Sequence, residues 1–435
     1  MPYNRMRPQA PDQPRMATGM LLRLSLILVA MLALYAVLTF DFWLPALVDR
    51  SRVTIGTLTN RSLVGALQLG LAGIILHALY ISGALLLWRA PYQARVARLV
   101  WLGAIGMALV LLLAYPVTST DIFDYIFRGR MAVDYGANPY LVLPNQFKSD
   151  PLYRYVGWPN APSAYGPLWE YVSWVLAWLG GASLLRAVLL YKALVIAAFF
   201  ACGGIIHLFV RDPQQRLLGV YLWLWSPLAL WEIAAIGHND SLLVLSLLLA
   251  LWAVQHERYA LAVLALVGGA LFKFLPAIFL PLVVLAWLRR QPTWPRRFRV
   301  FALAFVLCAL PTLLLYAPYW DLPAQFTRLP FNDQLQAIWQ GRTRTLRNVA
   351  VREGFLNASP LAVLSYQLQA PASVTWLNQI GGRLGLPAAG NTDVRAAVSA
   401  FGSALLLLGV AWQSWWVWDR RRPLQVAFLG LLIWY

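Results

Sequence analysis

The densest group of chemically competent side chains lies between residues 118 and 130. Two carboxylates, Asp121 and Asp124, stand three residues apart and are followed by the guanidinium groups of Arg128 and Arg130. A carboxylate can take the proton of a hydroxyl group, and arginine side chains can neutralise a phosphate through paired hydrogen bonds. The segment therefore has the groups needed to move a substituent from a phosphate ester to a hydroxyl.

The spacing of this segment predicts a helix with two different faces. Residues three and four apart share a helix face, which groups Asp121, Asp124, Tyr125 and Arg128 on one face and Ile122, Phe123, Ile126 and Phe127 on the other. Such a helix is expected to lie in the membrane interface with its polar face at headgroup depth. A purely structural alternative also fits, because Thr118 and Asp121 match a capping pattern. Asp124 with Arg128 would then be a surface ion pair worth about 0–1 kcal/mol.

Two further polar features interrupt apolar runs. His238 stands beside Asn239 and Asp240 at a predicted membrane boundary, where it is expected to bind phosphate or orient a hydroxyl. The structural alternative is that Asn239 or Asp240 caps the helix that follows. Lys273 lies between two short apolar segments, where a lysine is a functional hypothesis by default, with snorkelling to the interface as the alternative.

Aromatic and turn residues surround these groups. The segment 136–140 reads as a turn, and a proline-rich, aromatic segment leads back into an apolar run near Tyr165. Aromatic rings can stack on sugar faces, although they also pack at membrane interfaces. The residues expected to contact substrate are Tyr125, Asn138, Tyr140, Tyr165, Asn239 and Asp240, and those expected to bind a donor phosphate are Arg128, Arg130, Lys273 and His238.

Composition shows what must position these groups. Hydrophobic residues make up 60% of the chain and charged residues 12%, against roughly a quarter charged in soluble domains. Many apolar runs approach the roughly 20 residues that cross a bilayer. They lie near 18–40, 63–88, 97–115, 165–182, 184–210, 217–236, 240–255, 259–272, 275–288, 299–318, 396–418 and 423–435. The sequence predicts an all-α, polytopic bundle of about 11–13 transmembrane spans.

The net charge of +18 does not indicate nucleic-acid binding. The excess is nearly all arginine, in short clusters between apolar runs, as in cytoplasmic loops that orient membrane proteins. With the N-terminus in the cytoplasm, residues 116–164 form a first large extracytoplasmic loop carrying juxtamembrane helices, and residues 319–395 form a second. Cys202 and Cys308 fall inside predicted spans and indicate neither a disulfide nor a metal site.

Two details of this topology stay open. Between an outer Tyr165 and an inner Arg211 there are two apolar segments where parity allows one or three, so 165–182 is either re-entrant or lies along the surface. The segments on either side of Lys273 are too short to span comfortably and are expected to form a shallow hairpin. We expect a single transmembrane catalytic domain over residues 1–435. The chain stops inside an apolar run at Tyr435, so we expect the natural protein to continue.

The order of these motifs resembles the C-type glycosyltransferase (GT-C) superfamily, and most of all its polyprenol-phosphate-mannose-dependent mannosyltransferases of bacterial envelopes. The resemblance covers roughly residues 100–290. It implies a GT-C-like fold, a polyprenyl-phosphate sugar donor, an extracytoplasmic active site and an acidic residue acting as base early in the first outer loop. That role is carried over to Asp121 first and Asp124 second. The superfamily often has a closer pair of acids, so the choice between the two stays open.

The expected reaction is transfer of a sugar, with mannose favoured by the resemblance, to an envelope lipid or glycan with inversion at the anomeric carbon. Two or three cationic side chains suffice for a monoester leaving group, so no cofactor or metal is expected to be obligatory, although a divalent metal remains possible. The protein is expected in the bacterial inner (cytoplasmic) membrane as a multi-pass protein, with no nucleic-acid partner. The alternatives are a secondary transporter of a small solute and an envelope polymer ligase that uses a polyprenyl-diphosphate donor.

Overall fold

A computed structural model describes residues 13–50, 63–88, 90–320 and 332–340, together with positions 378, 379, 408 and 412. Every named element in the described part is a helix, and the one isolated bridge there pairs Trp43 with Ala114. The chain divides into two compact units. The first contains 1–137, 143–161 and 170–248, and the second contains 138–142, 162–169 and 249–435. The predicted all-α bundle is confirmed.

The helices of the first unit include four long ones and several short ones around the candidate site. They are α1 (Gln13–Asp41), α2 (Leu44–Leu47), α4 (Leu63–Trp88), α5 (Ala94–Leu112), α6 (Asp121–Tyr135), η1 (Pro144–Phe147), η2 (Tyr153–Tyr155), α8 (Leu184–Phe209), α9 (Pro213–Leu224), α10 (Pro227–Leu230) and the π-helix η3 (Trp231–Ala235). Two helices are divided between the units: α7 (Pro167–Gly180) and α11 (Asp240–Gln255).

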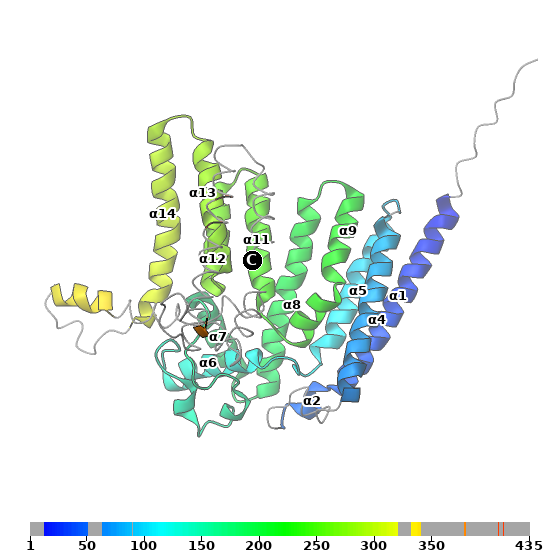
Figure 1. Ribbon diagram of the computed structural model, residues 1–435, viewed down its shortest axis with the longest axis horizontal. Coiled ribbons are helices and arrows are strands. Elements are labelled where there is room, and N and C mark those ends of the chain that lie inside the picture. The colour runs from blue at the N-terminus through cyan, green and yellow to red at the C-terminus, as the bar shows by residue number, and fades with distance from the viewer. Residues whose placement is uncertain are drawn as a thin grey trace, which may run out of the picture. The chain divides into compact units, whose positions relative to one another are not determined.

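The core of the first unit lies between its long helices. α5 packs against α1 and α9, and α4 packs against α1 and α9, so these four run side by side (Figure 1). Burial is concentrated on their facing sides, with Met107 and Trp225 fully covered while Leu102 and Leu109 on α5 are exposed. Outward leucines are what a bundle surrounded by lipid presents. The turn between α8 and α9 is fixed locally, because Asp212 accepts the backbone N–H of Gln215 as a helix cap.

A lysine closes the end of α5. Lys192 is on α8 and its side chain is fully buried. Its ammonium donates to the carbonyl oxygens of Leu111 and Leu112, at 3.3 and 3.2 Å, and to that of Ala114. The last carbonyls of a helix have no partner within it and carry its negative end, so a cation there satisfies both needs. Lys192 thereby fixes where α5 ends and where the chain toward α6 begins.

The second unit contains short helices around one longer helix. α12 (Tyr259–Phe272) packs on η4 (Leu275–Phe279), α13 (Leu280–Arg289) and α14 (Trp294–Tyr316), and η5 (Ala317–Tyr319) follows α14 (Figure 1). Lys273 ends α12 in an extended conformation, and its backbone N–H donates to Gly269 O at 2.9 Å. The expected pair of short helices flanking Lys273 is confirmed.

In the part of the chain that the structure describes, five helices are long and apolar enough to cross a membrane, and six if the pair α9 and α10–η3, bent by 47°, is one span. The five are Gly19–Asp41, Leu67–Trp88, Ala94–Leu112, Leu184–Phe209 and Trp294–Tyr319. The apolar helices Asp240–Gln255, Tyr259–Phe272 and Leu275–Arg289 are shorter. The number of full-length spans among the described residues is thus below the 11–13 expected for the whole chain, because four predicted segments, including 165–182, are short helices. Two further predicted segments lie outside the described residues.

The length of α7 bears on whether the segment 165–182 crosses the membrane. α7 has 14 residues, which is about 21 Å at 1.5 Å per residue and less than the roughly 30 Å of a hydrocarbon core. The segment 165–182 is therefore too short for a straight transmembrane span. The predicted segments 396–418 and 423–435, and nearly all of the second outer loop 319–395, lie outside the described residues.

Candidate active site

The chain between α5 and α6 is held at both ends. Near its start, the backbone N–H of Tyr115 donates to Phe42 O at 2.6 Å. At its end, Ser119 Oγ accepts the backbone N–H of Asp121 at 3.2 Å, and Thr120 is the N-cap residue without a side-chain cap. Because α6 begins at Asp121, the capping role considered for Thr118 is wrong. Asp121 and Asp124 fall in the first helical turn, where the positive end of the helix dipole favours carboxylates.

Asp124 is a buried carboxylate with its acceptors in use. Its Oδ2 accepts the backbone N–H of Gly157 at 3.0 Å, and its Oδ1 accepts that of Trp158 at 3.1 Å. A side chain at position 157 would collide with Thr120 Oγ1, so glycine permits this close approach. Burial raises the pKa of the Asp124 carboxyl to about 6, although Arg128 and the two N–H groups favour its charged form. Asp124 therefore fastens the loop 157–158 to the start of α6.

Asp121 differs from Asp124 in exposure and in contacts. Its side chain is 31% exposed. The indole Nε1 of Trp158 lies 3.4 Å from Asp121 Oδ1, and Nε2 of His238 lies 3.9 Å from Oδ2. These are long contacts compared with charge-assisted hydrogen bonds of about 2.7–2.9 Å. A substrate hydroxyl can approach Asp121, whereas Asp124 is enclosed.

His238 is held by Glu232 and faces Asp121. Its Nδ1 lies 2.7 Å from Glu232 Oε2, and its backbone N–H donates to Glu232 O at 3.0 Å. The preceding Gly237 adopts a φ of 86°, which glycine tolerates best. Burial alone would lower the pKa of the imidazole. The hydrogen bond to Glu232 and the charges of Asp121, Glu232 and Asp240 outweigh burial, so the pKa of His238 is raised. The result is a carboxylate–imidazole–carboxylate arrangement.

The π-helix η3 supplies Glu232. Its first residue, Trp231, directs its indole Nε1 to Thr118 Oγ1 at 3.3 Å, which ties η3 to the segment that precedes α6. π-turns are frequent at functional sites. Glu232 was not among the residues predicted from the sequence. A carboxylate inside the apolar run 217–236 is expensive in a membrane and is a functional hypothesis by default, so the signal was present.

Asn239 has polar atoms available for a ligand. It is buried, and neither its Oδ1 nor its Nδ2 has a hydrogen-bond partner among the described residues. The capping role considered for its side chain is therefore not realised. Asp240 is the first residue of α11, and Ser241 donates to Val195 O at 2.8 Å. Buried amides usually have partners, so Asn239 fits the substrate-binding role predicted for it.

Arg128 lies on the Asp124 side of α6. It is buried, its Nη2 donates to Ala161 O at 2.9 Å, and its Nη1 has no partner in the described part of the chain. Arginine retains its charge even when buried, and the open nitrogen can meet an anion. The predicted role in binding the donor phosphate remains compatible with this geometry.

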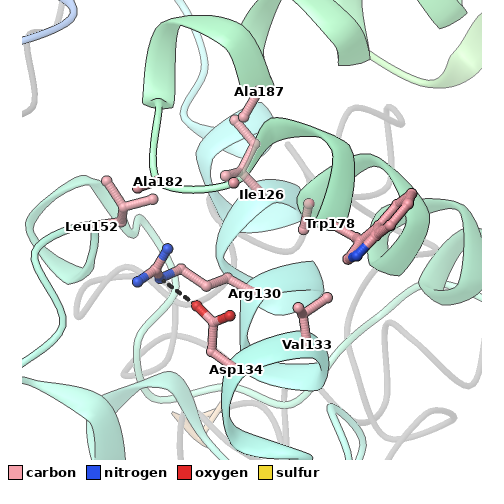
Figure 2. Close-up of a pocket in the computed structure, with 10 residues that line it drawn as sticks. Ile126, Arg130, Val133, Asp134, Leu152, Trp178, Ala182 and Ala187 are labelled. Carbon is pink, nitrogen blue, oxygen red and sulfur yellow. Dashed lines mark ion pairs between the residues drawn. The ribbon is translucent and has the colours of Figure 1, made fainter.

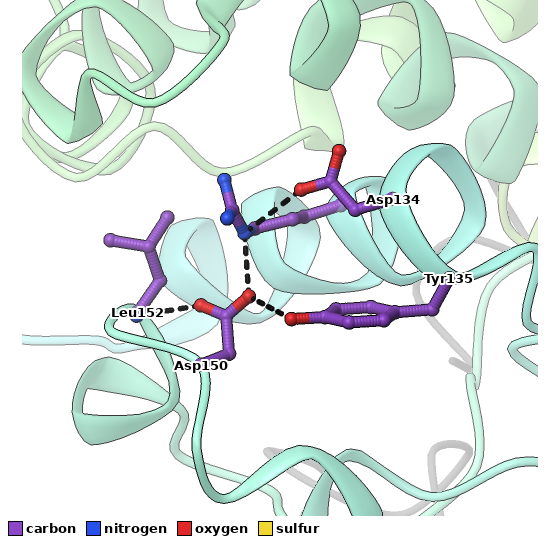
Figure 3. Close-up of polar contacts among 5 residues, drawn as sticks. Asp134, Tyr135, Asp150 and Leu152 are labelled. Atoms are coloured by element: carbon purple, nitrogen blue, oxygen red, sulfur yellow. Dashed lines mark hydrogen bonds and ion pairs between the residues drawn. The ribbon is translucent and has the colours of Figure 1, made fainter.

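Arg130 belongs to a different group. Its Nε lies 2.7 Å from Asp150 Oδ2 and 3.2 Å from Asp134 Oδ2, and Tyr135 donates to the same Asp150 oxygen at 2.7 Å (Figure 3). Burial alone would raise the pKa of Asp150, but Arg130, Tyr135 and the backbone N–H of Leu152 lower it overall. Arg130 follows Asp121 by nine residues, which puts it on the opposite face of α6 and about 13 Å along the axis. The structure does not bring Arg130 to Asp121.

A cavity of about 350 Å³ adjoins Arg130. Figure 2 shows the Arg130 guanidinium and its ion pair with Asp134 beside Leu152 and Ala182. The lining residues come from α6, the loop after η1, the end of α7 and the start of α8: Ile126, Arg130, Val133, Asp134, Leu152, Ala177, Trp178, Gly181, Ala182 and Ala187. The cavity thus combines charged groups, an aromatic ring and small apolar side chains.

The predicted open polar face of α6 is corrected by the structure. Asp124, Tyr125 and Arg128 are all buried, as are the apolar residues opposite them. The loop 157–161 covers the polar side through the contacts to Asp124 and Arg128. Tyr125 stacks on Tyr191 at a centroid distance of 6.3 Å. This ring is packed within the protein, so the N-terminal half of α6 is enclosed, and Asp121 is the more accessible of the two acids there.

The remaining predicted substrate residues belong to the second unit. Asn138 Nδ2 donates to Tyr319 O at 2.7 Å, and Asn138 Oδ1 accepts the backbone N–H of Tyr140 at 3.0 Å. Tyr140 is fully buried and donates to Tyr165 O at 2.9 Å. These residues form a local network around the turn at 138–140. Lys273 also belongs to the second unit.

A metal ion needs several ligating side chains close to one another. In the described ranges, no set of three or more His, Cys, Asp or Glu side chains could hold a metal ion. The expectation that no divalent metal is obligatory stays a prediction.

Comparison with known proteins identifies the family. Residues 17–289 match the family model described as "Alpha-(1->6)-mannopyranosyltransferase, N-terminal domain". The chain belongs to this family. Its match begins well before residue 100, where the sequence motifs placed the start of the resemblance. The predicted membership among mannosyltransferases of the GT-C type is confirmed.

A curated relative within the mannopyranosyltransferase family is Alpha-(1->6)-mannopyranosyltransferase A of Corynebacterium glutamicum, 25% identical over 184 residues. The aligned part covers 41% of this chain and 37% of the relative. The chain thus aligns with little more than a third of that protein. No solved structure matches the chain. Family membership and the helical bundle establish a multi-pass membrane protein of the mannosyltransferase family.

Proposed function

We propose that this protein transfers mannose from a polyprenyl-phosphate donor to a hydroxyl group of an envelope lipid or glycan, with inversion at the anomeric carbon. Membership of the mannopyranosyltransferase family supports the sugar. The observation that carries the mechanism is the contrast between two acids of α6. Asp121 is accessible and lies beside His238, whereas Asp124 is enclosed with both oxygens accepting backbone N–H groups.

The chemical step is a single displacement. The acceptor oxygen forms a bond to the anomeric carbon as its proton passes to Asp121, and the bond from that carbon to the phosphate oxygen breaks. The electron pair leaves with the polyprenyl phosphate. A positioned carboxylate base contributes roughly a hundredfold to ten-thousandfold to such a step. Asp124 acts by holding the loop that carries Trp158 against Asp121.

Charge develops on the departing phosphate and needs a cation. His238 lies 3.9 Å from Asp121 and can supply a positive charge, and Glu232 favours its protonated form through the 2.7 Å contact. Arg128 adds a permanent charge with one nitrogen open. The role of Lys273 in binding the donor phosphate stays a prediction. With these cations the reaction needs no obligatory metal, so treatment with a chelator should leave activity intact.

We place the protein in the bacterial inner membrane with the active site on the extracytoplasmic side. Support comes from Arg211 and Arg216 in the turn between α8 and α9, since arginine marks cytoplasmic loops. α6 follows the other end of α5, and Lys192 near the start of α8 contacts that end. A cysteine introduced at Lys148 should then react with a membrane-impermeant reagent in intact cells. Protection there, with labelling only after lysis, would contradict this orientation.

The function is tested with purified protein, a short-chain polyprenyl-phosphate mannose and an α-mannoside acceptor. We expect a new mannosyl linkage of configuration opposite to that of the donor, read by NMR. Asp121→Asn should abolish it while Asp41→Asn, an exposed acid at the end of α1, should not. Product of retained configuration would overturn the mechanism. Activity only with a diphosphate donor would favour a polymer ligase, and solute uptake without any donor would favour a transporter.

A further inference from the structure

We propose that the cavity beside Arg130 binds a hexose unit of the acceptor glycan, away from the reacting hydroxyl. The proposal rests on the proposed function and extends it to the form of the acceptor. The cavity has about 350 Å³, within the roughly 300–1,000 Å³ typical of small-molecule sites. It lies within the first unit, between α6, the end of α7 and the start of α8.

The polar groups of the cavity suit hydroxyl groups. Arg130 uses its Nε for both carboxylates, which leaves the N–H groups of Nη1 and Nη2 without a partner in the described part of the chain. Asp134 uses Oδ2 for Arg130 and keeps Oδ1 available. A sugar hydroxyl both donates and accepts. One hydroxyl can therefore accept from Arg130 while its neighbour donates to Asp134.

The charge of the group argues against an anion. Arg130 supplies one positive charge, whereas Asp134 and Asp150 together supply two negative charges. A phosphate would meet a net negative group in a partly buried setting, where like charges repel most strongly. The predicted donor-phosphate role of Arg130 is therefore replaced here by a role toward a neutral polyol.

An aromatic ring completes the site. Trp178 is among the lining residues and is 67% exposed, so its ring is open to a ligand. An exposed indole can cover the apolar C–H face of a pyranose while the hydroxyl groups point to Arg130 and Asp134. Ile126 and Val133 supply further apolar contact.

The distance along α6 between Asp121 and the cavity requires a ligand that is an extended chain if it is to reach both. Arg130 and Asp134 follow Asp121 by nine and thirteen residues, which is about 13 and 20 Å along α6. A single sugar at Asp121 cannot occupy this cavity. An oligosaccharide that is extended by one mannose at a time would place its new end at Asp121 and pass around α6, so that an earlier unit occupies this cavity on the opposite face of the helix.

The test measures binding without donor, so it is independent of transferase activity. Calorimetry with α-(1→6)-linked mannotetraose would compare the native protein with Trp178→Ala, Asp134→Asn and Trp174→Ala. Trp174 lies one turn earlier on α7, is 47% exposed and does not line the cavity, so it is the matched control. We expect roughly tenfold weaker binding for the first two variants, about one lost hydrogen bond or contact each, and native affinity for the control.

The outcomes separate this proposal from the proposed function. Equal affinities in all four proteins, or no binding to the native protein, would overturn the subsite even if mannosyl transfer is observed. Retained binding with no mannosyl transfer would support the subsite and overturn the transferase. If Trp178→Ala lowers only stability in the membrane, Trp178 is a bilayer anchor and the subsite is wrong. With an active enzyme, the ratio of kcat/KM for mannotetraose over mannobiose should fall in Trp178→Ala.

Discussion

The two ends of α6 use aspartate side chains in different ways. At its C-terminal end, Arg130, Asp150 and Tyr135 meet at 2.7 Å. At its N-terminal end, Asp121 lies 3.4 Å from Trp158 Nε1 and 3.9 Å from His238 Nε2, and His238 lies 2.7 Å from Glu232. A network closed by short contacts fixes the position of a helix. A partly exposed carboxylate beside an imidazole can be reached by a substrate hydroxyl, as a general base must be.

The largest expected effect comes from a substitution at the N-terminal end of α6. Asp121→Asn removes the proposed base and should lower kcat by roughly a thousandfold, because an amide cannot take a proton at neutral pH. The exposed position of Asp121 predicts no loss of Tm. Initial rates with a polyprenyl-phosphate mannose, together with a thermal melt, would check both. A variant with more than a tenth of native kcat would exclude Asp121 as the base.

The next largest effect comes from substitutions in the hydrogen-bond network at the C-terminal end of α6. Asp150→Asn removes a buried acceptor shared by Arg130 and Tyr135 and should cost about 2–3 kcal/mol of folding stability. Tyr135→Phe removes one of these hydrogen bonds and should cost about 1 kcal/mol. Thermal melts in detergent would rank the variants. If both are as stable as native protein, the network is not structural.

The same network predicts an acid limit. The folded-state pKa of Asp150 is lowered, so its stabilisation is present above its unfolded pKa near 3.9 and is lost as the pH falls through its folded pKa. Native protein should therefore lose more Tm than Asp150→Asn when the pH is lowered below about 4.

Glu232→Gln should sharpen the comparison through pH. The pKa of His238 is raised chiefly by Glu232, so protonated His238 is present below its unfolded pKa near 6.5 and lost as the pH rises through its folded pKa. Without Glu232 that pKa falls. The alkaline limb of the kcat profile should move to lower pH, with roughly tenfold less activity above neutrality. Glu257→Gln, which breaks an exposed pair with Arg290, is the matched control. An unmoved alkaline limb would remove His238 from the mechanism.

The smallest effect concerns Asp124. Its folded-state pKa is about 6, above its ordinary value of 3.8. The folded protein therefore keeps a proton that the unfolded chain loses, and the contribution of Asp124 to stability falls as the pH rises from about 4 to about 6. The difference in Tm between native protein and Asp124→Asn should consequently depend on pH across this interval. A difference in Tm that does not change with pH would show that the pKa of Asp124 is not raised in the folded protein.

Much of this architecture could be predicted from the sequence, because the length of an apolar run and the residues that end a helix can be read from neighbouring positions. The segments 18–40, 63–88 and 184–210 coincide with helices, and the short pair around Lys273 was recognised by its length. The burial of Arg128 could not be predicted. Its cover, Ala161, lies 33 residues further along the chain, and no local pattern encodes that return.

Glu232 shows a different reason. Its place beside His238 depends on a π-turn that follows a bend of 47°. An α-helical projection of residues 217–236 gives no hint of either. Asp121 was singled out because it stands at a helix start next to a second acid, and those features are visible in a linear sequence.

Lys192 has a consequence for how the protein enters the membrane during synthesis. A lysine within an isolated apolar helix raises the free energy of insertion by roughly 2.5–3.5 kcal/mol. α5 is made before α8, and its terminal carbonyls remain without partners until the Lys192 ammonium reaches them. Each helix thus carries a polar group that only the other can satisfy. Retention of α5 near the translocon until α8 emerges would let the two helices satisfy each other's polar groups as they enter the lipid.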